Sequence, residues 1–201
     1  MSPLTLSALF ELLGYLQRTP QAEADLRPLV DQLSASGDLF DRKNLSGHIT
    51  ASVLVLDAAR EQALLVRHNA TGFWLQPGGH VDASEDRSLW DAALRETLEE
   101  AGVRGVKCLD ELADPDGAPV VFDIAQIAVP PSRSKEEGAH RHFDYLFVGQ
   151  LAHTAPLVLA LSEVGDAKWW ELAQIEALPG TRLPRVIRKL RQSGLVGSLP
   201  A

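Results

Sequence analysis

Apolar residues recur every three or four positions near the N-terminus, and this spacing predicts two helices. The first covers residues 3–17, with an apolar stripe formed by Leu6, Leu9, Phe10, Leu13 and Leu16. Thr19 and Pro20 interrupt the pattern, and residues 22–33 form the second helix, with an inward face of Leu26, Leu29, Val30 and Leu33. Because both stripes need a surface to cover, we expect them to pack on the rest of the chain or on a second copy of it.

After Gly47 the pattern changes to that of strands, which are rich in β-branched residues. Predicted strands cover residues 49–56, 62–66, 73–75, 106–112, 119–129, 142–151 and 167–170. One long helix precedes the fourth strand, and two shorter helices follow the last strand at residues 171–178 and 181–193. Strands interrupted by one central helix, with helices at both ends, predict an α/β (α+β) fold. We expect a helical extension at residues 1–44 and the main domain at residues 45–201.

Composition narrows the class of protein. The chain has 201 residues and a net charge of −8, whereas binders of nucleic-acid polymers and membrane surfaces usually carry a basic footprint. No run reaches the roughly 18 apolar residues of a membrane span, and the N-terminus lacks the basic region of a signal peptide. Cys108 is the single cysteine, which fits a reducing compartment. These features predict a cytoplasmic protein and leave open a small anionic substrate.

The long central helix has recognisable ends. Ser84 is the predicted N-cap, because serine side chains accept hydrogen bonds from the first helical N–H groups. Gly102 is the predicted stop, because glycine readily adopts the left-handed conformation that ends helices. Between them, large apolar residues recur at helical spacing, and we expect a core-facing stripe of Trp90, Leu94, Leu98 and Ala101.

Three glutamates share another face of this helix. Glu96, Glu99 and Glu100 are three and four positions apart, so their carboxylates lie close together and repel one another. A divalent cation would remove that repulsion, and hard ions such as Mg²⁺ prefer oxygen ligands. Three glutamates by themselves also fit a solvated helix face. The surrounding sequence is needed to distinguish that face from a metal site.

The stretch from Gly79 to Val103 resembles the signature of the Nudix hydrolases. That signature is Gly, five residues, Glu, seven residues, and then Arg-Glu-U-x-Glu-Glu-x-Gly-U, where U is bulky and apolar. Residues 95–103 (RETLEEAGV) match the second half, with Thr97 at the first U position. Gly79 and Glu85 match the first half, but nine residues separate Glu85 from Arg95. We expect the two additional residues to lengthen the loop before the helix, which leaves the role of Glu85 open.

The resemblance implies a Nudix-type α/β/α sandwich with a mixed central sheet. It also implies that Glu96, Glu99 and Glu100 hold Mg²⁺ or Mn²⁺, which would neutralise a pyrophosphate and activate the attacking water. Arg95 would orient the carboxylates, most simply through Glu99, and Gly79 would let the backbone approach the phosphates. The implied enzyme is a Nudix pyrophosphohydrolase that cleaves a phosphoanhydride bond in a nucleoside diphosphate linked to another group.

Residues outside the helix supply further candidates. His80 follows the glycine pair, and His142 and Asp144 alternate with His140 on one predicted strand face, where they could reach phosphates. Arg141 could meet a phosphate too. Solvated polar positions at a strand end are the alternative explanation. We call the signature from Gly79 to Val103 the box. Family members often use one acid outside the box as a metal ligand or base, and the candidates here are Asp123, Asp144, Glu136 and Glu137.

Two other functions compete with hydrolysis. A non-catalytic, nucleotide-binding Nudix-like module is the first, although such modules usually lose box carboxylates and this chain keeps all three on the helix. An isopentenyl-diphosphate isomerase is the second. That chemistry needs a cysteine just before the box, where this chain has Gln76 and Pro77. A homodimer through residues 1–35 is a separate expectation.

Overall fold

The computed structural model describes residues 2–34, 38–69, 71–131, 138–153, 156–162 and 164–198. The chain divides into two compact units, and each unit combines three separate stretches of sequence. Unit 1 comprises Met1–Ser52, Gly78–Ala93 and Val120–Phe147. Unit 2 comprises Val53–Pro77, Leu94–Pro119 and Val148–Ala201. Three elements pass through both units: β1 (His48–Leu56), α3 (Leu89–Ala101) and β7 (His140–Gln150).

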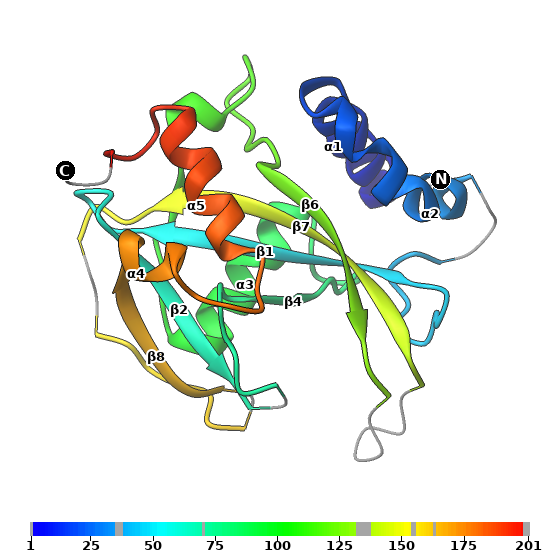
Figure 1. Cartoon of the computed structure of the whole chain (residues 1–201). Coiled ribbons are helices and arrows are strands. Elements are labelled where there is room, and N and C mark those ends of the chain that lie inside the picture. Colours follow the sequence, from blue (N-terminus) through cyan, green and yellow to red (C-terminus); the bar gives the residue numbers. More distant parts are fainter. Residues whose placement is uncertain are drawn as a thin grey trace. The chain divides into compact units, whose positions relative to one another are not determined.

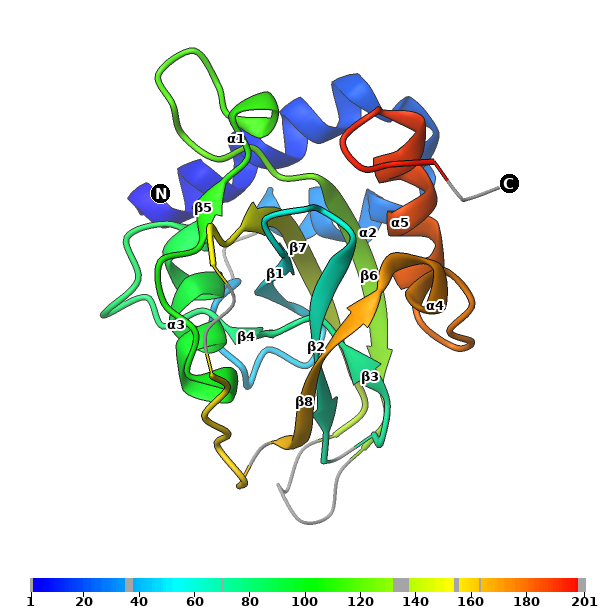
Figure 2. The same ribbon diagram turned by 90° about the vertical axis from the view of Figure 1, so that its left-hand side faces the viewer.

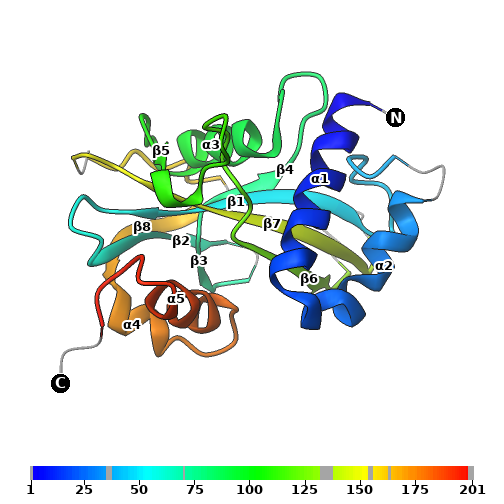
Figure 3. The same cartoon turned by 90° about the horizontal axis from the view of Figure 1, so that it is seen from above.

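Unit 1 begins with two helices, α1 (Pro3–Arg18) and α2 (Glu23–Leu33), joined by the short 3-10 helix η1 (Pro20–Ala22). Both helices contact β6 (Asp123–Val129), as Figure 3 shows. β6 pairs with β7 in antiparallel register from Asp123 opposite Leu146 to Val129 opposite His140. The short strand β4 (Gly78–His80) pairs with the first part of β1.

The buried face of α1 differs from the predicted one. Leu4, Ala8, Leu12 and Tyr15 are buried, whereas Leu6, Phe10 and Leu13 are exposed. The Tyr15 hydroxyl donates a hydrogen bond of 3.0 Å to the buried Asp123 carboxylate, and the Tyr145 hydroxyl donates one of 3.1 Å to the Ala8 carbonyl. The helix carries apolar residues on two faces, and these polar contacts hold the face with the alanine and the tyrosine against the strands. In α2 the predicted Leu26, Leu29 and Leu33 are indeed buried.

Unit 2 is built around a strand pair, β2 (Gln62–His68) and β8 (Val164–Glu171), which are antiparallel along their length (Figures 1 and 2). β3 (Trp74–Leu75) pairs with β2, and β5 (Lys107–Cys108), followed by the 3-10 helix η2 (Asp110–Leu112), pairs with β7. The chain ends in α4 (Leu172–Glu176) and α5 (Leu183–Gln192). In α5, apolar residues three and four apart form the fully buried face: Leu183, Val186, Ile187 and Leu190.

The strands are hydrogen-bonded in the order β3-β2-β1-β7-β5, with β4 attached to β1, β6 to β7 and β8 to β2. The predicted α/β (α+β) class, with a central sheet and an N-terminal helical extension, is confirmed. Among the helices of the described residues, none has both the length and the apolar character needed to cross a bilayer.

Candidate active site

The helix α3 starts later than the sequence suggested. Ser88 caps it, because its hydroxyl accepts a hydrogen bond of 3.0 Å from the N–H of Asp91. The predicted cap, Ser84, lies in a turn, where its N–H and hydroxyl both donate to the Asp82 carboxylate. The predicted stop is confirmed, since Gly102 follows the helix with a φ of +69°.

The core-facing side of α3 also differs from the prediction. Of the predicted stripe, Ala101 is fully buried, whereas Trp90, Leu94 and Leu98 are partly exposed. Ala92, Ala93 and Thr97 are fully buried instead. Small side chains let a helix approach its neighbours closely, and periodicity weighted by large apolar residues misses them. Thr97 therefore occupies the apolar position of the box as a buried residue.

The box carboxylates lie on α3 within unit 2. Glu96 and Glu100 are buried, with 8% and 3% of their surface exposed, while the Glu99 side chain is half exposed. The Arg95 guanidinium donates to Glu96 at 2.9 Å and to Glu99 at 3.3 Å. Arg95 thus contacts Glu96 in addition to Glu99, the partner that the sequence predicted. Two buried carboxylates within one helical turn repel each other, and the Arg95 guanidinium beside Glu96 offsets part of that repulsion.

The first half of the box lies in unit 1. Gly79 and His80 form part of β4, opposite Ala51 and Thr50 of β1 respectively. Glu85 is exposed in the turn before α3, and its N–H donates to a backbone carbonyl at Asp82 rather than lying in the helix.

The candidates on β7 differ in accessibility. Arg141 is exposed and His142 is partly buried. Asp144 is buried, and its two carboxylate oxygens accept hydrogen bonds from the hydroxyls of Thr50 at 2.7 Å and Ser52 at 2.5 Å. Asp144 therefore links β7 to β1. Glu136 and Glu137 lie outside the described residues.

Sequence reasoning missed His48, which is completely buried on β1. Its ring lies 5.1 Å from the His80 ring, 5.1 Å from His140 and 4.7 Å from His142, measured between centroids. Burial, together with repulsion from His80, His48 and His140, lowers the pKa of His142 to about 3, although Asp144 opposes the shift. The available signal was the alternation of polar His48, Thr50 and Ser52 within an apolar strand.

A family model, the NUDIX domain, matches residues 47–190. The chain belongs to the Nudix family. The predicted enzyme class, a Nudix pyrophosphohydrolase acting on acid anhydrides, is confirmed at the level of this family. Residues 1–46 precede the matched region. No curated protein matches the sequence.

Solved Nudix-type structures share the fold at low sequence identity. The Ap4A hydrolase of C. elegans, solved as a binary complex, is 21% identical, with a TM-score of 0.53 over 73% of this chain and 97% of that one. The dihydroneopterin triphosphate pyrophosphohydrolase of E. coli is 16% identical, with a TM-score of 0.54 over 72% and 95%. The NUDIX domain of Shewanella oneidensis NrtR, complexed with ADP ribose, is 18% identical, with a TM-score of 0.50 over 85% and 97%.

The glutamates of this Nudix chain suit a hard divalent cation. Their donor atoms are all carboxylate oxygens, which Mg²⁺ and Mn²⁺ prefer, and Glu96 and Glu100 are buried within one helical turn of each other. An isomerase would need a cysteine just before the box. Cys108 lies instead on β5, where its thiol donates to the carbonyls of Leu109 and Leu112.

Proposed function

We propose that the chain is a metal-dependent hydrolase that cleaves a phosphoanhydride bond in a nucleoside diphosphate linked to another group. The observation that supports the proposal is the turn of α3 that carries Glu96, Glu99 and Glu100, which we call the carboxylate turn. Glu96 and Glu100 are buried, and Glu99 is accessible beside them. Glu96, Glu99 and Glu100 would hold Mg²⁺ or Mn²⁺. When bound, the metal supplies charge neutralisation on the phosphates and a water of lowered pKa.

The protein groups have separate tasks in this proposal. Arg95 positions Glu96 and Glu99 through the hydrogen bonds that it donates to both. Glu99 is the accessible carboxylate, so it is the group best suited to take a proton from the attacking water. Gly79, His80, Arg141 and His142 are assigned to substrate binding. Asp144 contributes by joining β1 and β7, because both its oxygens are engaged there.

A panel of substrates tests the activity. Ap4A, ADP ribose and dihydroneopterin triphosphate are the compounds named with the structural neighbours, and nucleoside diphosphate sugars extend the panel. We expect turnover of at least one compound with Mg²⁺ or Mn²⁺, and its loss when EDTA removes the metal. Product release is measured by chromatography with and without metal. If every compound stays intact at saturating metal, the hydrolase proposal is wrong.

A nucleotide-binding module is the second candidate. The NrtR domain, which shares the fold, was solved with ADP ribose bound. Calorimetry on the same panel separates the two functions. Tight binding of a compound that survives incubation with metal would favour the binding module.

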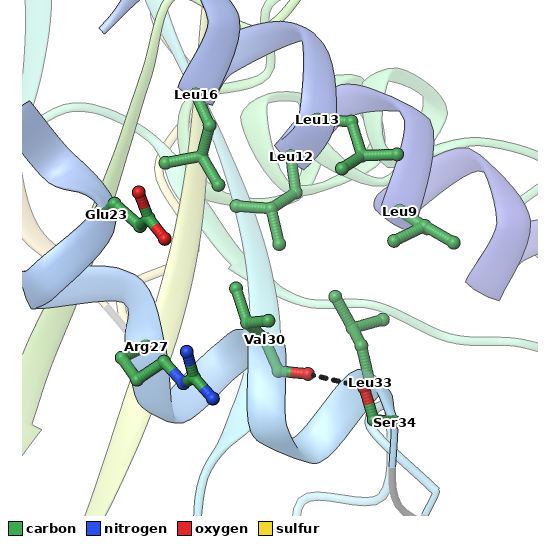
Figure 4. Close-up of a pocket in the computed structure, with 9 residues that line it drawn as sticks. All are labelled: Leu9, Leu12, Leu13, Leu16, Glu23, Arg27, Val30, Leu33 and Ser34. Carbon is green, nitrogen blue, oxygen red and sulfur yellow. Dashed lines mark hydrogen bonds between the residues drawn. The ribbon is translucent and has the colours of Figure 1, made fainter. Parts of the chain in front are cut away.

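We further propose that the chain forms a cytoplasmic homodimer through residues 1–35. These residues belong to the helical extension of residues 1–44, which precedes the main domain of residues 45–201. Leu6, Phe10 and Leu13 form an exposed stripe on α1, with Phe10 69% exposed. Next to it, α1 and α2 line a partly open pocket of about 480 Å³. The residues that line it are mostly apolar, as Figure 4 shows. A contiguous apolar patch of this kind marks an interaction site, and a second copy of α1 offers a stripe of the same spacing.

Replacing Phe10 by glutamate is expected to convert the dimer to a monomer, because the charge would be buried at the centre of the interface. Light scattering coupled to size-exclusion chromatography measures the mass. Gln17→Glu is the matched control. Gln17 is exposed on the same helix, and its replacement by glutamate adds the same charge. A wild-type mass of one chain, or an unchanged dimer after the Phe10 substitution, contradicts the proposal.

A further inference from the structure

Four histidines from three separate stretches of the sequence gather in unit 1. His48 lies on β1, His80 on β4, and His140 and His142 on β7. His48, His80 and His142 can each offer a ring nitrogen, and these three atoms lie within 4.8 Å of one another. The chain has six histidines, so most of them converge on this one place. Unlike the glutamates of α3, the candidate ligand atoms here are all ring nitrogens.

The spacing of the ring nitrogens suits coordination. The Nε2 atoms of His48 and His80 are 3.1 Å apart. Two imidazole nitrogens bound to one tetrahedral ion at 2.0–2.1 Å lie about 3.3 Å from each other. His48 and His80 therefore need to move by only a few tenths of an ångström to share an ion, and the His142 nitrogen lies within 4.8 Å of both.

Backbone carbonyls orient two of the rings. Nδ1 of His48 lies 3.3 Å from the Asn44 carbonyl, and Nδ1 of His140 lies 2.8 Å from the Gly138 carbonyl. A carbonyl accepts, so each Nδ1 carries the proton and each Nε2 presents a lone pair. Metal-binding histidines are commonly held in this way by a carbonyl behind the ring. His140 in turn contacts His142, with 3.1 Å between their Nε2 atoms.

The surroundings of His142 favour its neutral form, and neutral imidazole is the state that binds metals. His48 is completely buried, and the low pKa of His142 follows from burial and from the neighbouring rings. An ion at this place would bind one ring nitrogen from each of His48, His80 and His142.

We propose that His48, His80 and His142 form a site for a transition-metal ion, with Zn²⁺ as the expected occupant and His140 as a positioning residue for His142. Imidazole nitrogens suit Zn²⁺ rather than Mg²⁺, so this site is chemically distinct from the glutamates of α3. Three histidines leave a fourth position for water or a phosphate oxygen. The site would tie β1, β4 and β7 together.

Zinc binding is tested on tag-free, full-length protein stripped with a chelator and then titrated with Zn²⁺ in a calorimeter. We expect one equivalent to bind in wild type, and His80→Gln and His142→Gln to lower the affinity by more than about 100-fold, since even loss of a residue behind a ligand costs 10–100-fold. Co²⁺ in place of Zn²⁺ is expected to show the intense visible absorption of a low-coordinate nitrogen site. His153→Gln is the matched control, because His153 is exposed.

Other outcomes decide against the site. If His80→Gln and His142→Gln bind Zn²⁺ as tightly as wild type, or if wild type binds no equivalent, the proposal is overturned. Loss of Zn²⁺ binding in Glu99→Gln, with binding retained in both histidine variants, would assign the ion to α3 instead. Circular dichroism of each variant checks the fold. No substrate enters this experiment, so its result is independent of the proposed hydrolysis.

Discussion

Replacing Glu99 by glutamine is expected to lower kcat on the order of 1000-fold, while the fold stays intact. The substitution keeps the shape of the side chain and removes the one accessible charge of the carboxylate turn. Losing a single electrostatic contact to a reacting centre commonly costs 100-fold to 1000-fold, and Glu99 is proposed both to hold the metal and to accept a proton. The measurement is single-substrate kinetics at saturating Mg²⁺, with the best compound of the panel.

Glu61→Gln is the control for this experiment. Glu61 is exposed in unit 2, away from α3 in sequence, and we expect its kcat to equal that of wild type. Glu85→Gln adds a second comparison, because Glu85 matches the first half of the box. A Glu99 variant with wild-type kcat would remove Glu99 from the mechanism. A Glu85 variant as slow as the Glu99 variant would place the first half of the box in the chemistry.

Replacing Gly78 by alanine is expected to destabilise the protein by about 3 kcal/mol. Gly78 has a φ of +155° and pairs with Ser52 of β1. A methyl group there would lie 2.6 Å from the Ala51 carbonyl oxygen and 2.6 Å from the Ser52 Cα, both of which are backbone atoms of a buried strand. Forcing extra atoms into a packed interior costs 1–3 kcal/mol, and an unfavourable φ adds strain. Urea unfolding monitored by tryptophan fluorescence measures the loss.

Gly72→Ala separates the two causes. Gly72 also has a positive φ, +70°, but a methyl group there would meet nothing within 4 Å. The expected cost is therefore that of backbone strain alone, about 1 kcal/mol. Equal losses in the two variants would show that the close approach of β4 to β1 contributes nothing.

The family and the fold class could be predicted because they depend on spacing. The Arg95–Val103 run combines a charged face with a glycine stop, and helical geometry fixes both without tertiary information. The buried face of α3 could not be predicted in the same way. Ala92, Ala93 and Thr97 are weakly apolar or polar in isolation, and close packing, which the sequence does not display, makes them the core. On α1, two stripes of equal spacing competed, and contacts from distant strands decided between them.

The histidine cluster shows a different limit. His80 and His142 could be selected from the sequence as polar residues near the box, whereas His48 was overlooked because it opens an apolar strand. Its alternation with Thr50 and Ser52 matches the alternation of His140, His142 and Asp144 on β7. Two such polar stripes are compatible with burial only if they face each other, and strand pairing is what brings them together.

The division of unit 1 into three stretches of chain has a consequence for how the protein is made. Asp144 meets Thr50 and Ser52 across separations of 94 and 92 residues, and Tyr15 meets Asp123 across 108. Contacts of such high contact order form slowly, since the loops between them must close first. The N-terminal helices are also synthesised long before the strands that they contact. Unit 1 therefore reaches its final structure only after residue 147 has been synthesised.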